Sequence, residues 1–259
     1  MATSISLGRH LLEHVPIRHV PARQPLVWLR QGWDDLRCCG WASLAHGVLV
    51  VTMGFVLLAV CSAHLYLVVA AVTGYLLVGP VMTTGLCELS RRRASGEPLG
   101  FDESLTAVAR SPASFAQFGA VLAAIALIWL VASQAAFSSL LAAPGPGLDW
   151  DVLLWGSFTG DLSGAQTLAY VGSGAVLAAI VFVLSVVAVP IIIDRGATAS
   201  EAMWVGVRAV RANLSAMIVW ALLIAALTAL SFVTMLIGMI VVMPVLGHAT
   251  WHAYRDLVR

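Results

Sequence analysis

Long apolar runs without charge constrain this chain more than any other feature of its sequence. Residues 41–61 contain no Asp, Glu, Lys or Arg. At about 1.5 Å per residue, a helix of that length crosses the roughly 30 Å hydrocarbon layer of a bilayer. Of the 259 residues, 60% are hydrophobic and 10% are charged, and soluble domains carry far more charge. The sequence therefore predicts an integral membrane protein, with the lipid bilayer and not nucleic acid as its partner.

Further apolar runs extend this prediction to a bundle of helices. The predicted fold class is all-α, a polytopic membrane bundle with six transmembrane helices. The expected spans are residues 41–61, 65–86, 115–141, 167–190, 214–231 and 234–247. The polar, proline-broken residues 1–24 are expected to form a cytoplasmic arm, and residues 25–259 a single transmembrane domain.

Residues 214–246 admit two interpretations. One helix of this length would be ~50 Å long, which exceeds the hydrocarbon thickness, yet the stretch is short for two spans. The loop 143–166 contains Asp149, Asp151 and Asp161 but no Arg. The positive-inside rule places that loop outside and both termini in the cytoplasm, which requires an even number of crossings. We therefore expect a hairpin that turns near residues 231–234, with a single long kinked helix as the alternative.

Short amphipathic segments are expected on the cytoplasmic side, one before each pair of spans. In the first, apolar residues recur at helical spacing at Leu26, Leu29, Trp33 and Leu36. The residues expected on the opposite face are Arg30, Asp34, Asp35 and Arg37. This pattern predicts a helix at the membrane surface, with its Trp rings at headgroup depth.

Prolines near the ends of the outgoing spans suggest an internal repeat. They are Pro80, Pro190 and Pro244. A proline within a helix frees the carbonyl four residues earlier and bends the helix there. The sequence thus predicts three two-helix hairpins of one orientation, each introduced by an amphipathic cytoplasmic helix. Small residues, such as those in 42–47, are expected to let the helix backbones approach closely.

Polar residues after these prolines form the candidate metal site. His248 and His252 are four residues apart, so they lie on one helical face. If the hairpins close around an axis, Glu88 and Asp194 arrive at a similar depth, and two imidazoles with two carboxylates suit a first-row divalent metal. The alternative is that these are interfacial groups paired with nearby arginines. A haem would need a second axial ligand, which His46 could supply opposite His248.

The rest of the sequence gives little support for ion-coupled transport or catalysis. No Asp, Glu or Arg lies in the middle of an expected span, where ion-coupled pumps usually carry them. There is no phosphate-binding glycine loop and no nucleophile elbow. We therefore expect neither an enzyme nor a resident cofactor, apart from the metal or haem alternative.

Two stretches carry a resemblance to a known family. Residues 25–36 (PLVWLRQGWDDL) and 247–257 (GHATWHAYRDL), together with Gly79-Pro80 before an acidic residue and a basic cluster, resemble a bacterial family of uncharacterised integral membrane proteins. That family is domain of unknown function 2189. The resemblance implies a multi-pass protein of the bacterial inner (cytoplasmic) membrane.

Three functional hypotheses follow from these observations. The first is a non-enzymatic multi-pass inner-membrane protein, a scaffold or accessory subunit of a larger respiratory or photosynthetic complex. The second is a passive channel or small-solute transporter. The third is a metal- or haem-binding membrane protein. The expected partners are the lipid bilayer and, under the first hypothesis, other membrane-complex subunits.

Overall fold

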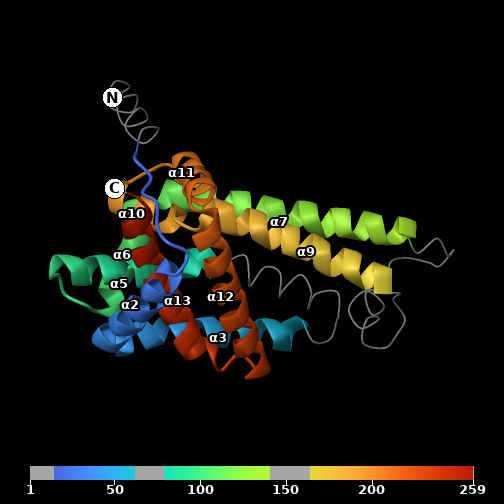
Figure 1. Cartoon of the computed structure of the whole chain (residues 1–259). Coiled ribbons are helices and arrows are strands. Elements are labelled where there is room, and N and C mark those ends of the chain that lie inside the picture. The colour runs from blue at the N-terminus through green and yellow to red at the C-terminus, as the bar shows by residue number, and fades with distance from the viewer. Residues whose placement is uncertain (1–14, 62–78, 141–163, 259) are drawn as a thin grey trace. The chain divides into compact units, whose positions relative to one another are not determined.

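The computed structural model describes residues 15–61, 79–140 and 164–258 (Figure 1). These residues are helical, with one isolated β-bridge between Ile17 and Val258 and no strand among them. The helices are α2 (Gln24–Cys39), α3 (Trp41–Cys61), α5 (Thr84–Ser95), α6 (Phe101–Arg110), α7 (Pro112–Leu140), α9 (Gly164–Ser185), α10 (Ala188–Arg195), α11 (Ala199–Ala212), α12 (Leu214–Val233) and α13 (Met239–Leu257). The all-α prediction is confirmed for this part of the chain.

Contacts divide the chain into two compact units. The larger comprises Met1–Thr52, Gly79–Gly119 and Phe182–Arg259, and the smaller comprises Met53–Val78 and Ala120–Val181. Every polar cluster described below lies within the larger unit. In the smaller unit, the described contacts include Trp129 of α7 against Gly174 of α9, where a Cβ on the glycine would lie 3.8 Å from the indole.

Four stretches of the described residues are long and apolar enough to cross a membrane. They are Trp41–Val60, Pro112–Trp129, Gly172–Arg195 and Leu214–Val233. They coincide with four of the six expected spans, so a multi-pass membrane protein is confirmed. The expected span 65–86 falls largely on residues outside the described ranges. The number six, the hairpin repeat and the cytoplasmic position of both termini stay predictions.

Residues 214–246 form two helices. Helix α12 ends at Val233 and α13 begins at Met239. In the turn between them, Met235 and Leu236 have φ values of 51° and 67°, a left-handed conformation that stops the helix. The structure therefore favours two helices over one long kinked helix. Helix α13 continues to Leu257 through a polar second half, and it is not among the four apolar candidates.

Pro190 and Pro244 have different effects on their helices. Before Pro190, the chain leaves helical geometry at Val186–Val187, between α9 and α10. This is the bend predicted from the lost hydrogen bond to the Val186 carbonyl. Pro244, by contrast, lies inside an unbroken α13. Of these two helices, only the one with Pro190 is therefore broken.

Close helix approach in the larger unit depends on two glycines. A Cβ on Gly32 of α2 would lie 2.5 Å from the Val245 carbonyl oxygen of α13, and one on Gly47 of α3 would lie 2.3 Å from the Ile240 carbonyl oxygen. Both distances are too short for any side chain, so only glycine allows these contacts. The expectation that small residues bring the helices together is confirmed here.

The faces of α2 differ from the prediction. Its buried residues are Pro25, Trp28, Gly32, Asp35, Leu36 and Cys39. Leu26 and Trp33, expected on the apolar face, are 56% and 45% exposed, whereas Asp35, expected opposite, is buried. Only the placement of Asp35 was wrong, because α2 packs against α13 of its own chain, where Gly32 gives room and other helices supply partners for Asp35. The position of α2 at the membrane surface, with Leu26 and Trp33 toward lipid, stays a prediction.

The segment before α2 is held against the C-terminus. The backbone N–H of Arg18 donates to the Leu257 carbonyl at 2.9 Å. Asn213 Oδ1 accepts a hydrogen bond from the Val20 backbone N–H at 2.8 Å, and Asn213 Nδ2 donates one to the Arg18 carbonyl at 3.0 Å. The described part of the expected arm is therefore docked on the helices, and residues 1–14 lie outside the described ranges.

Candidate functional site

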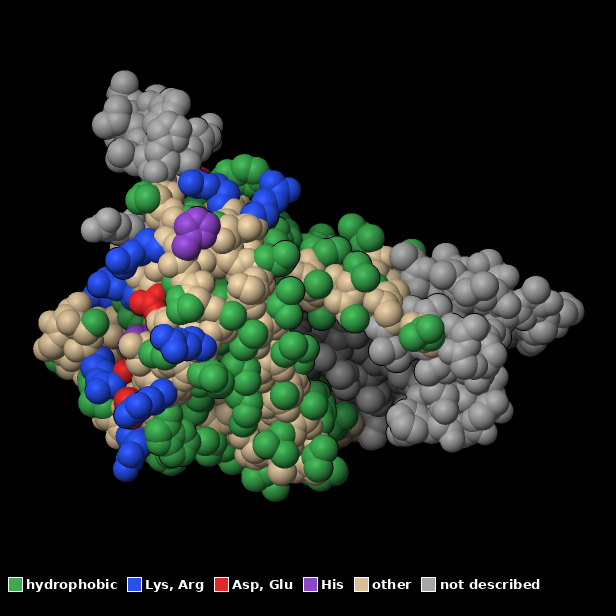
Figure 2. Space-filling view, in the orientation of Figure 1, with side chains coloured by type: hydrophobic (Ala, Val, Ile, Leu, Met, Phe, Trp, Pro, Cys, Tyr) green, Lys and Arg blue, Asp and Glu red, His purple; other side chains and the backbone are tan. Residues whose placement is uncertain are grey.

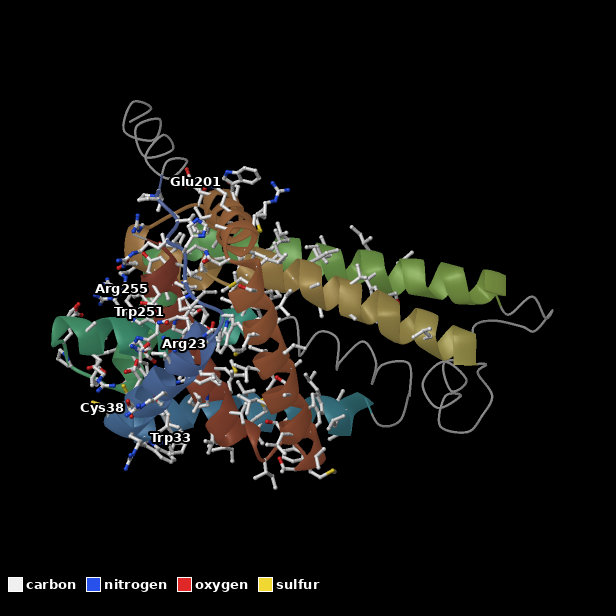
Figure 3. The ribbon with its side chains drawn as sticks, in the orientation of Figure 1. Arg23, Trp33, Cys38, Glu201, Trp251 and Arg255 are labelled. Carbon is white, nitrogen blue, oxygen red and sulfur yellow. The ribbon has the colours of Figure 1, made fainter. Side chains whose placement is uncertain are left out.

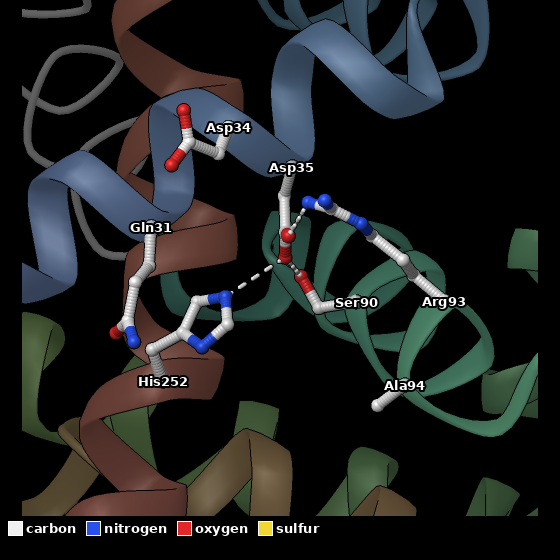
Figure 4. Close-up of a pocket in the computed structure, with 7 residues that line it drawn as sticks. All are labelled: Gln31, Asp34, Asp35, Ser90, Arg93, Ala94 and His252. Carbon is white, nitrogen blue, oxygen red and sulfur yellow. Dashed lines mark hydrogen bonds and ion pairs between the residues drawn. The ribbon is translucent and has the colours of Figure 1, made fainter.

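A buried carboxylate at the contact of α2, α5 and α13 organises the first polar cluster. We define the Asp35 cluster as Asp35, Ser43, Ser90, Arg93, His248 and His252. One Asp35 oxygen, Oδ2, accepts hydrogen bonds from the Ser90 hydroxyl and from His252 Nε2, the latter at 3.0 Å. The other, Oδ1, is paired with Arg93. Figure 4 shows these three side chains converging on Asp35 from two other helices.

His248 extends the Asp35 cluster inward. Its side chain is fully buried, with Nδ1 2.7 Å from Ser90 Oγ and Nε2 2.8 Å from Ser43 Oγ. Because the Ser90 hydroxyl donates to Asp35, its oxygen accepts from His248 Nδ1–H, and Nε2 then accepts from Ser43. The result is one directed chain of hydrogen bonds from Ser43 at the head of α3 to the carboxylate.

The protonation states in the Asp35 cluster follow from burial and partners. Burial in the protein lowers the pKa of His248 to about 4, so its imidazole is neutral near pH 7. Burial raises the pKa of Asp35, but hydrogen bonds from His252 and Ser90 and the nearby imidazoles lower it by more, and the net direction is down. The cluster therefore contains an ionised carboxylate beside a neutral histidine.

An open pocket of about 290 Å³ adjoins this cluster. Its lining residues are Gln31, Asp34, Asp35, Ser90, Arg93, Ala94 and His252. The side-chain oxygen of Gln31 is buried there without a hydrogen-bond partner. His252, 24% exposed, is the imidazole of the cluster that faces this opening, whereas His248 is sealed behind it.

A second buried carboxylate, Glu88, forms the Glu88 cluster with Arg91, Arg92 and Arg110. Glu88, Arg91 and Arg92 are spaced i, i+3 and i+4 on α5, so they share one face. The Nε atoms of Arg91 and Arg92 lie 2.9 Å from the carboxylate, and Nη2 of Arg110 on α6 lies 2.6 Å from it. Burial raises the pKa of Glu88, but the hydrogen bonds from Arg91 and Arg110 outweigh it and hold that pKa at about 2.

Asp194 belongs to a third group. At the end of α10, it accepts a hydrogen bond from the Tyr254 hydroxyl of α13 at 2.5 Å. Arg195 Nε donates to the same hydroxyl at 3.0 Å. Burial, with the hydrogen bond to Asp194, raises the pKa of Tyr254, so the hydroxyl keeps its proton and ties α10 to α13.

The four predicted metal ligands thus have different partners. His248 and His252 are brought together around Asp35, while Glu88 binds arginines and Asp194 binds Tyr254. Among the described residues, no group of three or more His, Cys, Asp or Glu side chains is arranged to hold a metal ion. The metal site stays a prediction, and its residues already have hydrogen-bond partners within the protein.

The proposed haem ligands are also engaged. His46 Nδ1 lies 2.9 Å from the Ala42 carbonyl, and its Nε2 lies 3.2 Å from Ser104 Oγ. Both nitrogens of His248 are likewise bonded to serines. Axial ligation by this pair would require each imidazole to give up one of these bonds, and the haem hypothesis stays a prediction.

Sequence reasoning missed Asp35, Ser43 and Ser90 as site residues. One signal could have found Asp35: it follows Trp28 and Gly32 at spacings of seven and three residues, which is one helical face. No sequence pattern marks the two serines, because their roles depend on contacts with residues far away in the sequence.

One comparison with known proteins matches part of this chain to a family model. Residues 67–194 match a family model described as "Predicted integral membrane protein (DUF2189)". Over these residues the chain is similar to the DUF2189 family. The matched part contains the whole Glu88 cluster, whereas Asp35, His248 and His252 lie outside it, as do the stretches 25–36 and 247–257. No curated protein and no solved structure matches the chain.

Proposed function

We propose that this protein is a non-enzymatic scaffold or accessory subunit of a larger membrane complex. The main observation behind the proposal is that its two buried carboxylates hold helices together. Asp35 joins α2 to α5 and α13, and Glu88 joins α5 to α6. Each carboxylate has several partners at hydrogen-bond distance, as expected of groups that fix helices in place.

Exposed apolar surface on the spans supports the same proposal. In the candidate span Leu214–Val233, 22% of the residues are buried. Leu214, Ile218 and Leu222 of α12 are 60%, 52% and 65% exposed. Figure 2 shows hydrophobic side chains gathered over α12 and arginines over the side that carries α2. Such a face suits lipid or the spans of other subunits.

The finer parts of the proposal rest on the sequence. We place the protein in a bacterial inner membrane because of the family resemblance, with respiratory or photosynthetic complexes as the candidate hosts. The proposal includes no substrate and no resident cofactor. It treats His248 and His252 as parts of the framework around Asp35.

Purification from native membranes in a mild detergent tests this function. We expect a particle that contains this 27.3 kDa chain and at least one other polypeptide in fixed stoichiometry, measured by native mass spectrometry. The variant Ala226→Trp, on the exposed side of α12, should release that polypeptide while the thermal unfolding midpoint stays unchanged, since lipid adapts to the added ring and a packed partner does not.

Two other results would contradict the proposal. A particle made of this chain alone, as monomer or homo-oligomer, would remove the scaffold role. A stoichiometric metal in elemental analysis, or a haem band in the visible spectrum, would favour the cofactor-binding alternative.

A further inference from the structure

One side of α2 presents a stripe of alternating apolar and basic residues. We define the α2 stripe as Leu26, Arg30, Trp33 and Arg37, which follow one another at spacings of four, three and four residues. Such spacing places them on one helical face. Leu26 and Trp33 are 56% and 45% exposed, and both arginines are exposed. Figure 3 shows Trp33 projecting from α2.

The start of α3 fixes the depth of this stripe. Gly40 alone separates α2 from α3, and its φ of 51° turns the chain. Trp41, 73% exposed, is the first residue of the candidate span Trp41–Val60. The C-terminal end of α2 therefore lies where the hydrocarbon layer begins, which is the depth that Trp rings prefer.

The positive charges of the two arginines in the stripe are not neutralised by any described carboxylate. Arg91, Arg92 and Arg110 neutralise Glu88, and Arg93 pairs with Asp35. Within the described residues no ion pair or hydrogen bond engages the guanidinium groups of Arg30 and Arg37, even though Asp34 is one turn from each of them. These two positive charges are left for a group outside the chain.

We propose that the α2 stripe is a binding site for anionic phospholipid headgroups. Arg30 and Arg37 are about two helical turns apart, so together they can bind one or two phosphates with planar N–H forks. Leu26 and Trp33 insert beside them into the boundary between headgroups and acyl chains, as in interfacial helices. Selection for net negative charge follows because zwitterionic headgroups present their own cation to the arginines.

Lipid retention by the full-length protein tests this site. The protein is placed in nanodiscs of equal phosphatidylglycerol and phosphatidylcholine, extracted in mild detergent, and its bound lipids are counted by native mass spectrometry. We expect enrichment of phosphatidylglycerol on the wild type. The double variant Arg30→Gln/Arg37→Gln should reduce that enrichment by roughly fivefold per arginine, the ratio that one interfacial charge supplies.

Matched variants separate charge from packing. Arg255→Gln removes an exposed arginine that lies well away from Trp33 in Figure 3, and it should leave the ratio unchanged. Arg30→Lys/Arg37→Lys should keep most of the enrichment. Trp33→Ala should lower retention of both lipids without changing their ratio. Thermal unfolding midpoints of the arginine variants should match the wild type, because among the described residues no hydrogen bond or ion pair joins Arg30 or Arg37 to the buried clusters.

The proposal fails if the double glutamine variant keeps the wild-type lipid ratio, or if Arg255→Gln lowers it as much. It also fails if the double variant leaves the lipids unchanged and loses a bound polypeptide, since the stripe would then be a protein-docking surface. A neutral phosphate ester that competes as well as phosphatidylglycerol would contradict the role of charge.

Discussion

The two buried carboxylates of this protein show two ways of holding a charge away from water. Glu88 is fully buried and Asp35 is 3% exposed, so both depend on partners. The partners of Glu88 are three guanidinium groups, which stay charged at every accessible pH. Those of Asp35 include two imidazoles and a hydroxyl. The first arrangement is permanent, whereas the second changes with protonation.

Because of this difference, the two clusters lose their contributions to stability over different pH ranges. Glu88 has its pKa lowered from 4.5 to about 2, so its contribution to stability is complete above pH 4.5 and is lost as the pH falls toward 2. His248 has its pKa lowered from 6.5 to about 4. The folded state therefore disfavours its protonation, and stability decreases as the pH falls from 6.5 toward 4.

Removing the Glu88 charge should have the largest effect. In Glu88→Gln, three arginines lose the anion that they share, and breaking one side of a buried ion pair costs about 3 kcal/mol. We expect the thermal unfolding midpoint in detergent to fall by on the order of 10 °C. The control Glu97→Gln removes a partly exposed carboxylate that also pairs with Arg91, and it should change the midpoint little. Equal shifts for the two variants would contradict a special role for Glu88.

Widening the contact of α2 and α13, which includes the Asp35 cluster, should have the next largest effect. The Cβ of Gly32→Ala would lie 2.5 Å from the Val245 carbonyl, so the helices must separate, at a cost of about 2 kcal/mol. Gly119→Ala is the matched control, because a Cβ there meets nothing within 4 Å. If both variants keep the wild-type midpoint, the close packing described for α2 is wrong.

Loss of the Tyr254 hydroxyl should have the smallest effect. Tyr254→Phe removes hydrogen bonds to Asp194 and Arg195 at the junction of α10 and α13, worth about 1 kcal/mol. Hydrogen exchange should become faster at the end of α10, while amides around Asp35 and Glu88 keep their protection. Faster exchange throughout α13 would instead make Tyr254 part of the Asp35 framework.

The sequence predicted the membrane helices because their signal is local. A charge-free run such as 41–61 identifies a span without knowledge of its neighbours, and the distribution of arginine favoured two helices in 214–246. Pro190 likewise predicted the break at Val186, although Pro244 inside the unbroken α13 shows that a proline does not always break its helix.

The Asp35 cluster could not be predicted in the same way. Asp35 is bound by Ser90, 55 residues away, and by His252, 217 residues away. A carboxylate becomes a core residue only when such partners arrive, so a pattern of hydrophobicity along α2 placed it on the wrong face. For the same reason, the sequence joined His248 to Glu88 and Asp194, and it omitted the carboxylate that His248 and His252 share.

The most direct test of the account is the pH dependence of stability in wild type and His248→Gln. His248 faces Asp35, His252, His46 and Arg93, and its burial predicts that wild-type stability falls by about 1 kcal/mol per pH unit between pH 6.5 and 4. In His248→Gln this slope should become clearly smaller, while the loss that begins below pH 4.5 remains and is reduced in Glu88→Gln. An unchanged slope in His248→Gln would contradict the division into one titratable and one permanent cluster.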